Sequence, residues 1–387
     1  MENRFFLILA SILLYACGND TGSTYSDIPG MDRVEIKERQ KISMDSVIAK
    51  IDYIKLGDTG DVLIGDVSYL LFTPDHIIVG DTYKANAVLF IFDRQGNPQT
   101  VINRFGRGPQ EYQSIRYVFL TPDKKTIGIV DRDGRKILYF DMDGNFKDKK
   151  SLPFYCDNAE WLDDETMMLV SSDGIALESY PNKEDLLFFT DSTLQIKSSA
   201  FPNPFDRTIF HYRLLHIKRF GDRIHACKAF GDTIYQVTSD GISPRYWLDM
   251  TAIGGVANFG KDMSSEKIKE PAYNTHFPNV YAESDDYAIF LLSNKDLVLP
   301  VLFNKQTKKT YNIDFASRTA LGINLLRSQF TLDNQFVTAI PAFQFLNVRP
   351  DVLDVELCNE IKEGLSDEDN PVLLFYTLKD PDVPAAE

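Results

Sequence analysis

The sequence predicts an all-β fold: a six-bladed β-propeller of four-stranded blades, preceded by an N-terminal lipoprotein signal peptide. Three observations predict it. A motif returns about every 50 residues, short apolar runs alternate with turn residues, and the N-terminus is charged, then apolar, then ends in a cysteine. One small sheet cannot cover both of its faces. Blades packed around an axis cover one another, so repeats of this kind indicate a propeller.

The N-terminus has the pattern of an export signal. Met1-Glu2-Asn3-Arg4 precede the apolar run Phe5–Leu14, which is too short for a membrane-spanning helix of about 20 apolar residues. Leu14-Tyr15-Ala16-Cys17 resembles a bacterial lipobox, in which the cysteine is lipidated and becomes the first mature residue. The alternative is an ordinary signal peptide that happens to carry a cysteine. We favour lipidation of Cys17.

The expected domain organisation follows from this start. We predict a signal peptide over 1–16, a lipidated tether over 17–33, the propeller over 34–379 and a disordered tail over 380–387. The residues after Cys17 are small and polar without apolar periodicity, which is typical of a flexible tether. The last residues are rich in proline and acids.

Composition narrows the function classes. The formal net charge is −15, and an acidic chain is a poor nucleic-acid binder because phosphate contacts need clustered Lys and Arg. Three cysteines remain after Cys17, namely Cys156, Cys227 and Cys358, and none forms a CxxC pair. We therefore predict no zinc site. One disulfide and buried free thiols are equally compatible with the spacing.

The repeat is clearest in the first half of the chain. Ile77–Asp81 followed by Val88–Asn97 aligns with Ile127–Asp131 followed by Ile137–Asn145. Weaker copies appear at 187–191 and 232–241. The strands expected in the clearest unit are Tyr117–Thr121, Thr126–Asp131, Lys136–Asp141 and Phe146–Leu152. Those expected later are Tyr287–Leu292, Leu297–Asn304, Lys309–Ile313, Phe336–Ile340 and Val372–Leu378.

Two further elements are expected, a helix near the end of the chain and a strand that closes the ring. A short surface helix is expected over Val352–Glu363, where apolar residues recur among acids. The final sheet needs one more strand, and the N-terminal stretch Lys50–Leu56, or alternatively Val34–Lys37, is the candidate that closes it.

Each clear repeat contains an Asp-x-x-Gly-Asn turn. Asp93 and Asp141 can accept hydrogen bonds from the turn backbone, and Gly96 and Gly144 allow a positive φ. The second turn also looks like the start of a calcium loop. Such a loop needs a bidentate acid further on, and 147–150 is lysine-rich, so we interpret both as hairpin turns.

A second motif, Phe105–Tyr112, lies between the first two repeats. Gly106 and Gly108 permit a sharp turn, and Pro109 rigidifies its exit. We favour a structural turn that joins two blades. The alternative places Arg107, Glu111 and Tyr112 at the mouth of the central channel as ligand-binding residues. Together with Trp161 they are the candidate binding set.

This Gly-x-Gly-Pro-x-Glu-Tyr run resembles the signature of Bacteroides-type six-bladed β-propeller lipoproteins of unknown function, whose architecture is similar to TolB-like and NHL-repeat propellers. The lipobox, the blade spacing and the ending 369–374 are also similar to that family. The resemblance covers nearly the whole mature chain. It implies an envelope protein that captures a ligand, and it implies no particular chemistry.

Catalytic motifs are missing from the sequence. No His-Glu-x-x-His or Gly-x-Ser-x-Gly pattern occurs, and the histidines are scattered: His76, His211, His216, His225 and His276. Asp81, Asp131 and Glu160 could meet in the channel, although Asp81 and Asp131 end equivalent strands and are expected to cap turns. Trp161 is expected on an inner strand, in the core.

These observations predict a non-catalytic, membrane-tethered binding module of the cell envelope, at the outer membrane of a Gram-negative bacterium. We expect a small molecule, glycan, peptide or envelope protein as its partner, with no cofactor, no metal and no nucleic acid. The alternatives are a hydrolase or lactonase with a metal in the channel, and a purely structural interaction module. Exposed stacked aromatic residues would favour a sugar, and clustered acids would favour a metal.

Overall fold

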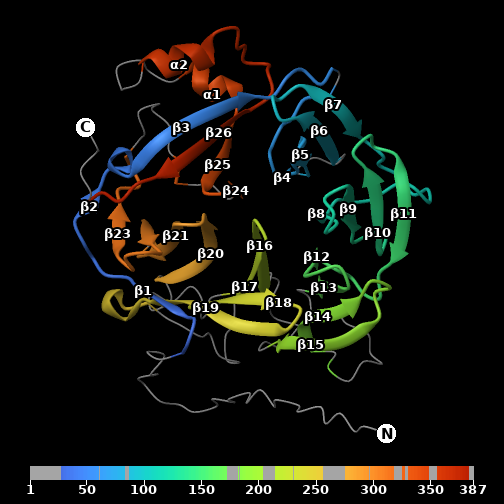
Figure 1. The fold of residues 1–387 in the computed structure, drawn as a ribbon, viewed down its shortest axis with the longest axis horizontal. Helices are drawn as coiled ribbons and strands as arrows, with labels where there is room; N and C mark the ends of the chain where they lie inside the picture. Colours follow the sequence, from blue (N-terminus) through green and yellow to red (C-terminus); the bar gives the residue numbers. More distant parts are fainter. Residues whose placement is uncertain are drawn as a thin grey trace, which may run out of the picture.

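The computed structural model describes residues 28–60, 62–82, 87–171, 182, 184–203, 214–229, 231–255, 275–295, 297–317, 325–326, 330–347 and 355–382. The predicted signal peptide, Cys17 and most of the predicted tether lie outside these residues. Within them, six sheets are arranged around a central axis, which confirms the predicted six-bladed propeller (Figure 1).

The first three blades are antiparallel four-stranded sheets in which the chain runs from the axis outward. Blade one contains β4 (Tyr69–Phe72), β5 (His76–Asp81), β6 (Val88–Asp93) and β7 (Pro98–Ile102). Blade two contains β8 (Tyr117–Leu120), β9 (Thr126–Asp131), β10 (Lys136–Asp141) and β11 (Phe146–Ser151). Blade three contains β12 (Asn158–Trp161), β13 (Thr166–Val170), β14 (Asp185–Asp191) and β15 (Ile196–Pro202).

The last three blades include strands from the N-terminal part of the chain. Blade four contains β16 (Leu215–Phe220), β17 (Arg223–Lys228), β18 (Thr233–Thr238), β19 (Gly241–Asp249) and, outermost, β1 (Asp32–Glu35). Blade five contains β20 (His276–Glu283), β21 (Tyr287–Asn294), β22 (Leu297–Asn304), β23 (Thr310–Ile313) and β2 (Lys41–Ile42). Blade six contains β24 (Phe330–Leu332), β25 (Gln335–Ile340), β26 (Val372–Leu378) and β3 (Ile48–Lys55).

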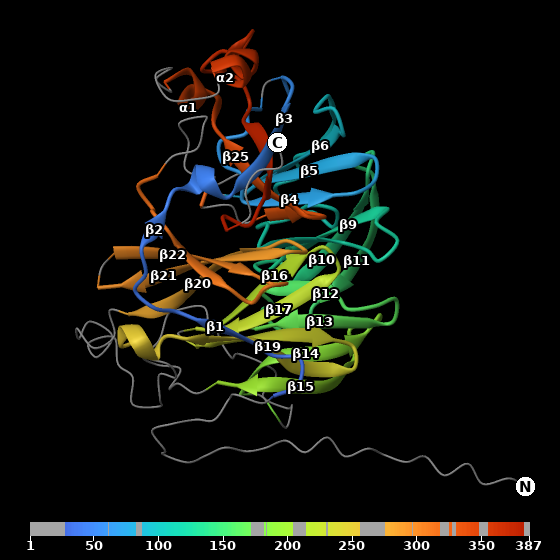
Figure 2. The same ribbon diagram turned by 60° about the vertical axis from the view of Figure 1, so that its left-hand side comes forward.

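The N-terminal strands form a strap, which we define as residues 32–55, along the outside of blades four, five and six (Figures 1 and 2). β1 and β2 pair in parallel with the outer strands β19 and β23, and β3 pairs antiparallel with β26. Of the two predicted closing segments, Lys50–Leu56 is therefore the one that closes the ring. Val34–Lys37 instead overlaps β1 and extends blade four.

Ion pairs fasten the start of the strap. Arg33 pairs with Asp249 at the end of β19. Asp32 pairs with Arg245 of β19 at 2.9 Å and with Lys308, beside β23, at 2.7 Å. The strap therefore crosses from blade four to blade five with a carboxylate bound to both blades.

The predicted strands later in the chain also occur, with ends that differ by at most a few residues. α2 (Val355–Lys362) lies within the predicted helix, and α1 (Ala342–Leu346) was not predicted. Two 3₁₀ turns, η1 (Met44–Ser46) and η2 (Thr251–Ile253), complete the elements. None of the helices in the described part of the chain is long and apolar enough to cross a membrane. Asp380, the first residue of the predicted tail, accepts a hydrogen bond from the Tyr311 hydroxyl at 2.8 Å, and residues 383–387 of that tail lie outside the described residues.

The two Asp-x-x-Gly-Asn turns pack blades one and two against the blade that precedes each of them in the ring. The Asp93 carboxylate accepts the backbone N–H groups of Gln95 and Asn97, both at 2.9 Å, as the sequence predicted. Gly96, at φ +88°, lies against the backbone of Lys55 in β3, and its carbonyl accepts the N–H of Gly57 at 2.8 Å. A Cβ atom at position 96 would collide with that backbone.

Gly144 repeats this arrangement one blade later. It has φ +76°, and a Cβ atom there would lie 2.7 Å from Cγ2 of Thr100 in β7. The glycine of the repeat therefore serves two purposes, a left-handed backbone and close contact with the preceding outer strand.

The Gly96→Ala substitution should destabilise the domain more than Gly364→Ala. Both glycines have positive φ, but nothing lies within 4 Å of a Cβ built on Gly364, so that variant incurs only the conformational cost of about 1 kcal/mol. Gly96→Ala adds the collision with β3, and we expect a total loss of at least ~2 kcal/mol. Urea unfolding measures both values, and equal losses would contradict the docking role.

Candidate functional site

The inner strands of all six blades surround a central cavity of about 670 Å³. Residues of β4, β8, β12, β16, β20 and β24 line it, so every blade contributes to its wall. The volume lies within the range of about 300–1,000 Å³ that is usual for pockets that bind small molecules. The cavity is the candidate site.

A buried carboxylate organises one side of the cavity. Glu160 on β12 is 1% exposed, accepts the Tyr117 hydroxyl of β8 at 2.8 Å and accepts Nε of Arg219 from β16 at 2.9 Å. A second guanidinium nitrogen of Arg219 donates to the carbonyl oxygen of Trp161 at 2.7 Å. Glu160 thus links three successive blades at the cavity wall.

The electrostatic consequences follow from burial and charge. Burial and the neighbouring Glu160 carboxylate raise the pKa of Tyr117 well above its ordinary value, so its hydroxyl remains a donor. Burial alone would lower the pKa of Arg219, but Glu160 outweighs it and the pKa is raised. Arg219 is therefore cationic at neutral pH. Removal of one member of such a pair is costly because it leaves a buried charge uncompensated.

Apolar side chains of the inner strands also line the cavity, most of them near the ends of those strands. We call them the apolar belt, and all are partly exposed: Leu71, Phe72, Leu120, Leu162, Val280, Phe330 and Leu332. Beyond the belt, exposed turn residues form a charged rim of Asp163, Asp222, Asp333 and Lys124. The cavity is therefore polar on one side, apolar further along and acidic at its edge.

Two polar atoms in the wall have no hydrogen-bond partner among the described residues. They are the indole Nε1 of Trp161 and Oδ1 of Asn158, both on β12. An unsatisfied buried polar atom costs free energy, so such atoms commonly have a water or ligand partner. The two ends of the Asn158 amide are exchangeable by rotation, so this side chain can present a donor or an acceptor.

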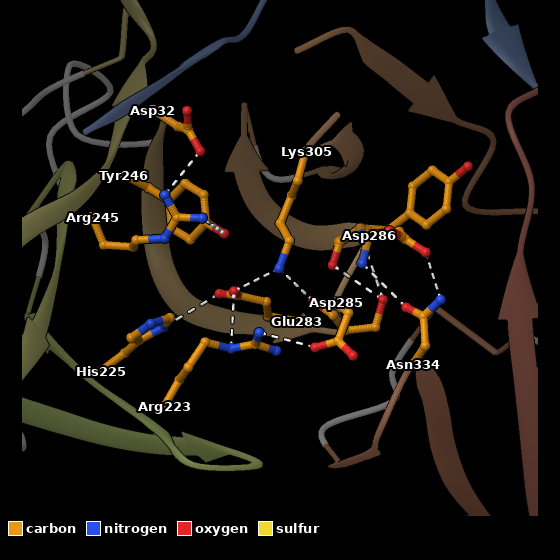
Figure 3. A network of polar contacts seen from close by, with 12 residues as sticks. Asp32, Arg223, His225, Arg245, Tyr246, Glu283, Asp285, Asp286, Lys305 and Asn334 are labelled. Atoms are coloured by element: carbon orange, nitrogen blue, oxygen red, sulfur yellow. Dashed lines mark hydrogen bonds and ion pairs between the residues drawn. The ribbon is translucent and has the colours of Figure 1, made fainter. Parts of the chain in front are cut away.

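A second polar cluster lies between blades four and five, outside the residues that line the cavity (Figure 3). Glu283, at the end of β20, is fully buried and pairs with Lys305 at 2.8 Å and with Arg223 at 3.4 Å. His225 Nδ1 lies 3.4 Å from the Glu283 carboxylate and 3.2 Å from the Tyr281 hydroxyl. Asp286 exchanges two hydrogen bonds with Asn334, which joins blades five and six.

His225 is neutral at pH 7 despite its acidic neighbour. Burial lowers its pKa to about 4, Glu283 opposes that shift, and the cations Arg245, Arg223 and Lys305 add to it. Burial also lowers the pKa of Lys305. The cluster holds blades four and five in register, and β16 of blade four carries Arg219 into the cavity.

The structure separates the predicted binding residues. Trp161 lines the cavity and is 9% exposed, whereas Arg107, Glu111 and Tyr112 are not among the lining residues. Tyr112 is fully buried, and its hydroxyl donates to the carbonyl oxygens of Ala87 and Ile102 at 2.8 and 3.0 Å. Ligand binding by these four residues remains a prediction.

The Phe105–Tyr112 segment is a compact loop between β7 and β8. The Glu111 carboxylate accepts the Gly108 N–H at 2.7 Å. A Cβ atom on Gly106 would collide with that carboxylate, and one on Gly108 would lie 3.0 Å from it. The glycines therefore make room for Glu111, and Pro109 lies in the loop that Glu111 closes, at the crossover between blades one and two.

The other predicted candidates also have clear positions. Asp81 accepts the N–H of Gly65 at 2.8 Å, in the segment before β4, and Asp131 accepts those of Gln113 and Ser114 at 3.1 Å, in the segment before β8. Asp131 also accepts the Gly134 N–H of its own turn at 3.0 Å, and neither acid lines the cavity. Glu160 alone of the three reaches the cavity. Cys156, Cys227 and Cys358 are buried free thiols. His216 lines the cavity, and His211 lies outside the described residues.

No group of three His, Cys, Asp or Glu side chains that could hold a metal ion occurs among the residues the structure describes. The cavity offers instead preorganised hydrogen-bond donors, one neutralised acid and an apolar wall. This arrangement can bind and orient a small molecule. Sequence reasoning missed Tyr117 and Arg219, because only the positions of adjacent blades bring them to Glu160.

Comparisons with known proteins agree with the fold. The profile of a family described as a domain of unknown function, DUF4934, matches residues 31–377. A Bacteroides fragilis protein described as a "Putative exported protein" is 19% identical, with 90% of this chain and 100% of that chain covered and a TM-score of 0.70. A Bacteroides vulgatus member of the DUF4221 family is 12% identical, with coverages of 86% and 97% and a TM-score of 0.53. No protein with curated annotation matches the sequence.

The His225→Gln variant should show a flatter dependence of stability on pH. The native pKa of about 4 lies below the unfolded value near 6.5, so the unfolded chain binds more protons between these two values. The contribution of His225 to the free energy of unfolding is fully present above about pH 6.5, and about 3 kcal/mol of it is lost as the pH drops towards 4.

Urea unfolding at several pH values in this window measures the effect, with His76→Gln as the control because His76 is half-buried and remote from Glu283. In the control, the free energy of unfolding should depend on pH as steeply as in the parent protein. If it depends on pH just as steeply in His225→Gln, the pH dependence does not come from His225.

Proposed function

The chain belongs to the family described as a domain of unknown function, DUF4934, and from that premise we propose that it is a membrane-tethered envelope propeller that binds a small molecule in its central cavity without catalysing a reaction. The main support for this proposal is the central cavity. It is large enough for a small molecule, it opens at an acidic rim, and its walls combine an apolar belt with fixed polar groups. A glycan or a protein partner at the same site is an alternative outcome of the test.

Rigidity of the walls supports binding. Glu160 and its two partners come from three blades, and the buried Glu283 cluster holds the neighbouring blade. A site built on packed strands needs little reorganisation when a ligand arrives, and preorganisation lowers the entropic cost of binding.

The location at the outer membrane is part of the same proposal. It is supported by the lipobox ending at Cys17 and by the small, polar residues that follow it. A lipid anchor and a tether would hold the propeller beside the membrane without inserting it.

Val280→Trp should abolish ligand binding in the cavity. Val280 lines the cavity from β20, and the larger ring would project into it and occupy space that a ligand needs. Val298→Trp is the matched control, because Val298 belongs to the same blade, is 38% exposed and does not line the cavity.

Candidate ligands come from a thermal-shift screen of the mature chain carrying Cys17→Ser. The screen tests small metabolites, oligosaccharides and peptides. Compounds that bind there should raise the Tm of the parent and of Val298→Trp and leave Val280→Trp unchanged. The absence of any stabilising compound, or shifts that persist in Val280→Trp, would refute binding in the cavity.

Cys17→Ser should release the protein from the membrane into a soluble envelope fraction. Metabolic labelling with radioactive palmitate should mark the parent and the Cys156→Ser control, since Cys156 is a buried free thiol, but should not mark Cys17→Ser. Label that remains on Cys17→Ser would rule out this anchor.

A further inference from the structure

We infer that the ligand of the central cavity is an uncharged amphipathic molecule, with an apolar body and hydroxyl or amide groups, and that Glu160 sets this preference. The inference rests on the proposed function, since it names the chemical class bound at the same site. It follows from the way charges are paired in the cavity wall and from the uncharged groups beside them.

The charged side chains that line the cavity do not share one sign. Two residues of β16, His216 and Lys218, interact with other groups of the protein. Neither sign is in clear excess, so the cavity as a whole has no general preference for anions or for cations. The lining contains three basic and four acidic residues: Lys124, Lys218, Arg219, Glu160, Asp163, Asp222 and Asp333.

Glu160 balances the charge of the Arg219 guanidinium in the wall. Arg219 donates from Nε to the Glu160 carboxylate at 2.9 Å, and 28% of its side chain remains exposed. Glu160 itself is 1% exposed and also accepts the Tyr117 hydroxyl. An anionic ligand would have to compete with Glu160 for Arg219, and a cationic ligand would be repelled by Arg219. An ion that loses its hydration without gaining a partner binds poorly.

Several polar groups in the wall are uncharged. Ser68, Thr82, Thr121 and Thr331 line the cavity with hydroxyl side chains, and Asn158 lines it with an amide. Oδ1 of Asn158 has no hydrogen-bond partner among the described residues. Hydroxyl and amide groups of a ligand can donate to and accept from such side chains without burying a net charge.

The apolar belt provides the contact for the body of the ligand. Its members come from blades one, two, three, five and six, and Ile217 of β16 adds an apolar side chain from blade four. Apolar surface therefore surrounds the axis on every side. Each methylene group buried against it should raise the affinity about fourfold.

Three eight-carbon probes that differ only in their head groups test the preference: 1-octanol, octanoate and octyltrimethylammonium. Isothermal titration calorimetry at neutral pH on the mature chain carrying Cys17→Ser, with each probe below its aggregation concentration, measures the affinities. We expect 1-octanol to bind about tenfold more tightly than either ion, because each ion would lose hydration and meet a wall with charges of both signs. 1-Hexanol, two methylene groups shorter, should bind about tenfold more weakly than 1-octanol.

Glu160→Gln tests the residue that sets the preference. Glutamine keeps the shape of the side chain and an oxygen that can accept a hydrogen bond, but it leaves the charge of Arg219 unbalanced. Octanoate should therefore bind this variant about tenfold more tightly than it binds the parent, and the affinity for 1-octanol should change little. The Tm with and without octanoate shows that the variant is folded and that the anion stabilises it.

Two matched controls keep the charge of Glu160. Tyr117→Phe removes a hydrogen bond to Glu160 without changing any charge. Asp164→Asn removes an exposed acid of the turn after β12 that does not line the cavity. Both variants should prefer 1-octanol over octanoate as the parent does.

Octanoate or octyltrimethylammonium that binds the parent as tightly as 1-octanol would overturn the inference, as would 1-octanol that does not bind. A folded Glu160→Gln variant that binds octanoate no better than the parent would also overturn it. Each of these results leaves the proposed function standing if other compounds still stabilise the parent and not Val280→Trp. The proposed function itself fails only when no compound depends on an open cavity.

Discussion

Closure of the ring between β3 and β26 is the interaction on which the rest of the molecule depends. A blade is stable only when both faces pack on neighbours, so an open chain of blades would expose the faces at its two ends. β3 comes from the start of the chain and β26 from near its end, and their antiparallel pairing places both in blade six. Every blade then has two neighbours, and the inner strands enclose the cavity.

The strap makes this closure part of a longer contact. Before it reaches blade six, it adds parallel strands to the outer edges of blades four and five, which leaves these edges covered. Asp32 and Arg33 fasten its start through ion pairs. If Cys17 is lipidated as proposed, the strap is the part of the fold that connects the tether to the ring.

Much of the fold could be predicted because it is repeated locally. Thr126–Asp131 and Lys136–Asp141 alternate with turn residues that have a fixed hydrogen-bonding role, and the same pattern occurs in the preceding blade. The closing strand was predicted as one of two segments, since both Val34–Lys37 and Lys50–Leu56 have β-forming residues. The sequence does not show which blade edge each one meets.

The site was less predictable, because it is made by contacts between blades. Glu160 was predicted only as one of three acids that could meet in the channel, and its partners Tyr117 and Arg219 lie 43 and 59 residues away in sequence. Glu283 had no local signal, because its partners come from the turn between β22 and β23 of its own blade and from blade four. Conversely, Gly106 and Glu111 form a distinctive motif because the crossover between blades is tight.

Two buried carboxylates bridge three of the interfaces between blades. Glu160 joins blades two, three and four beside the cavity, and Glu283 joins blades four and five in a sealed cluster. Such pairs are costly to desolvate and contribute little net stability, but a wrong register would leave their charges unpaired. They therefore favour one arrangement of the blades, and that arrangement shapes the cavity.

The central claim is that the axial cavity is the binding site. A crystal structure of the mature domain, grown with a compound that raises its Tm, tests this claim most directly. The account predicts one molecule in the cavity, in contact with lining residues of the inner strands such as Leu120 and Leu162. An empty cavity, or a molecule bound only on the outer surface of the blades, would contradict it.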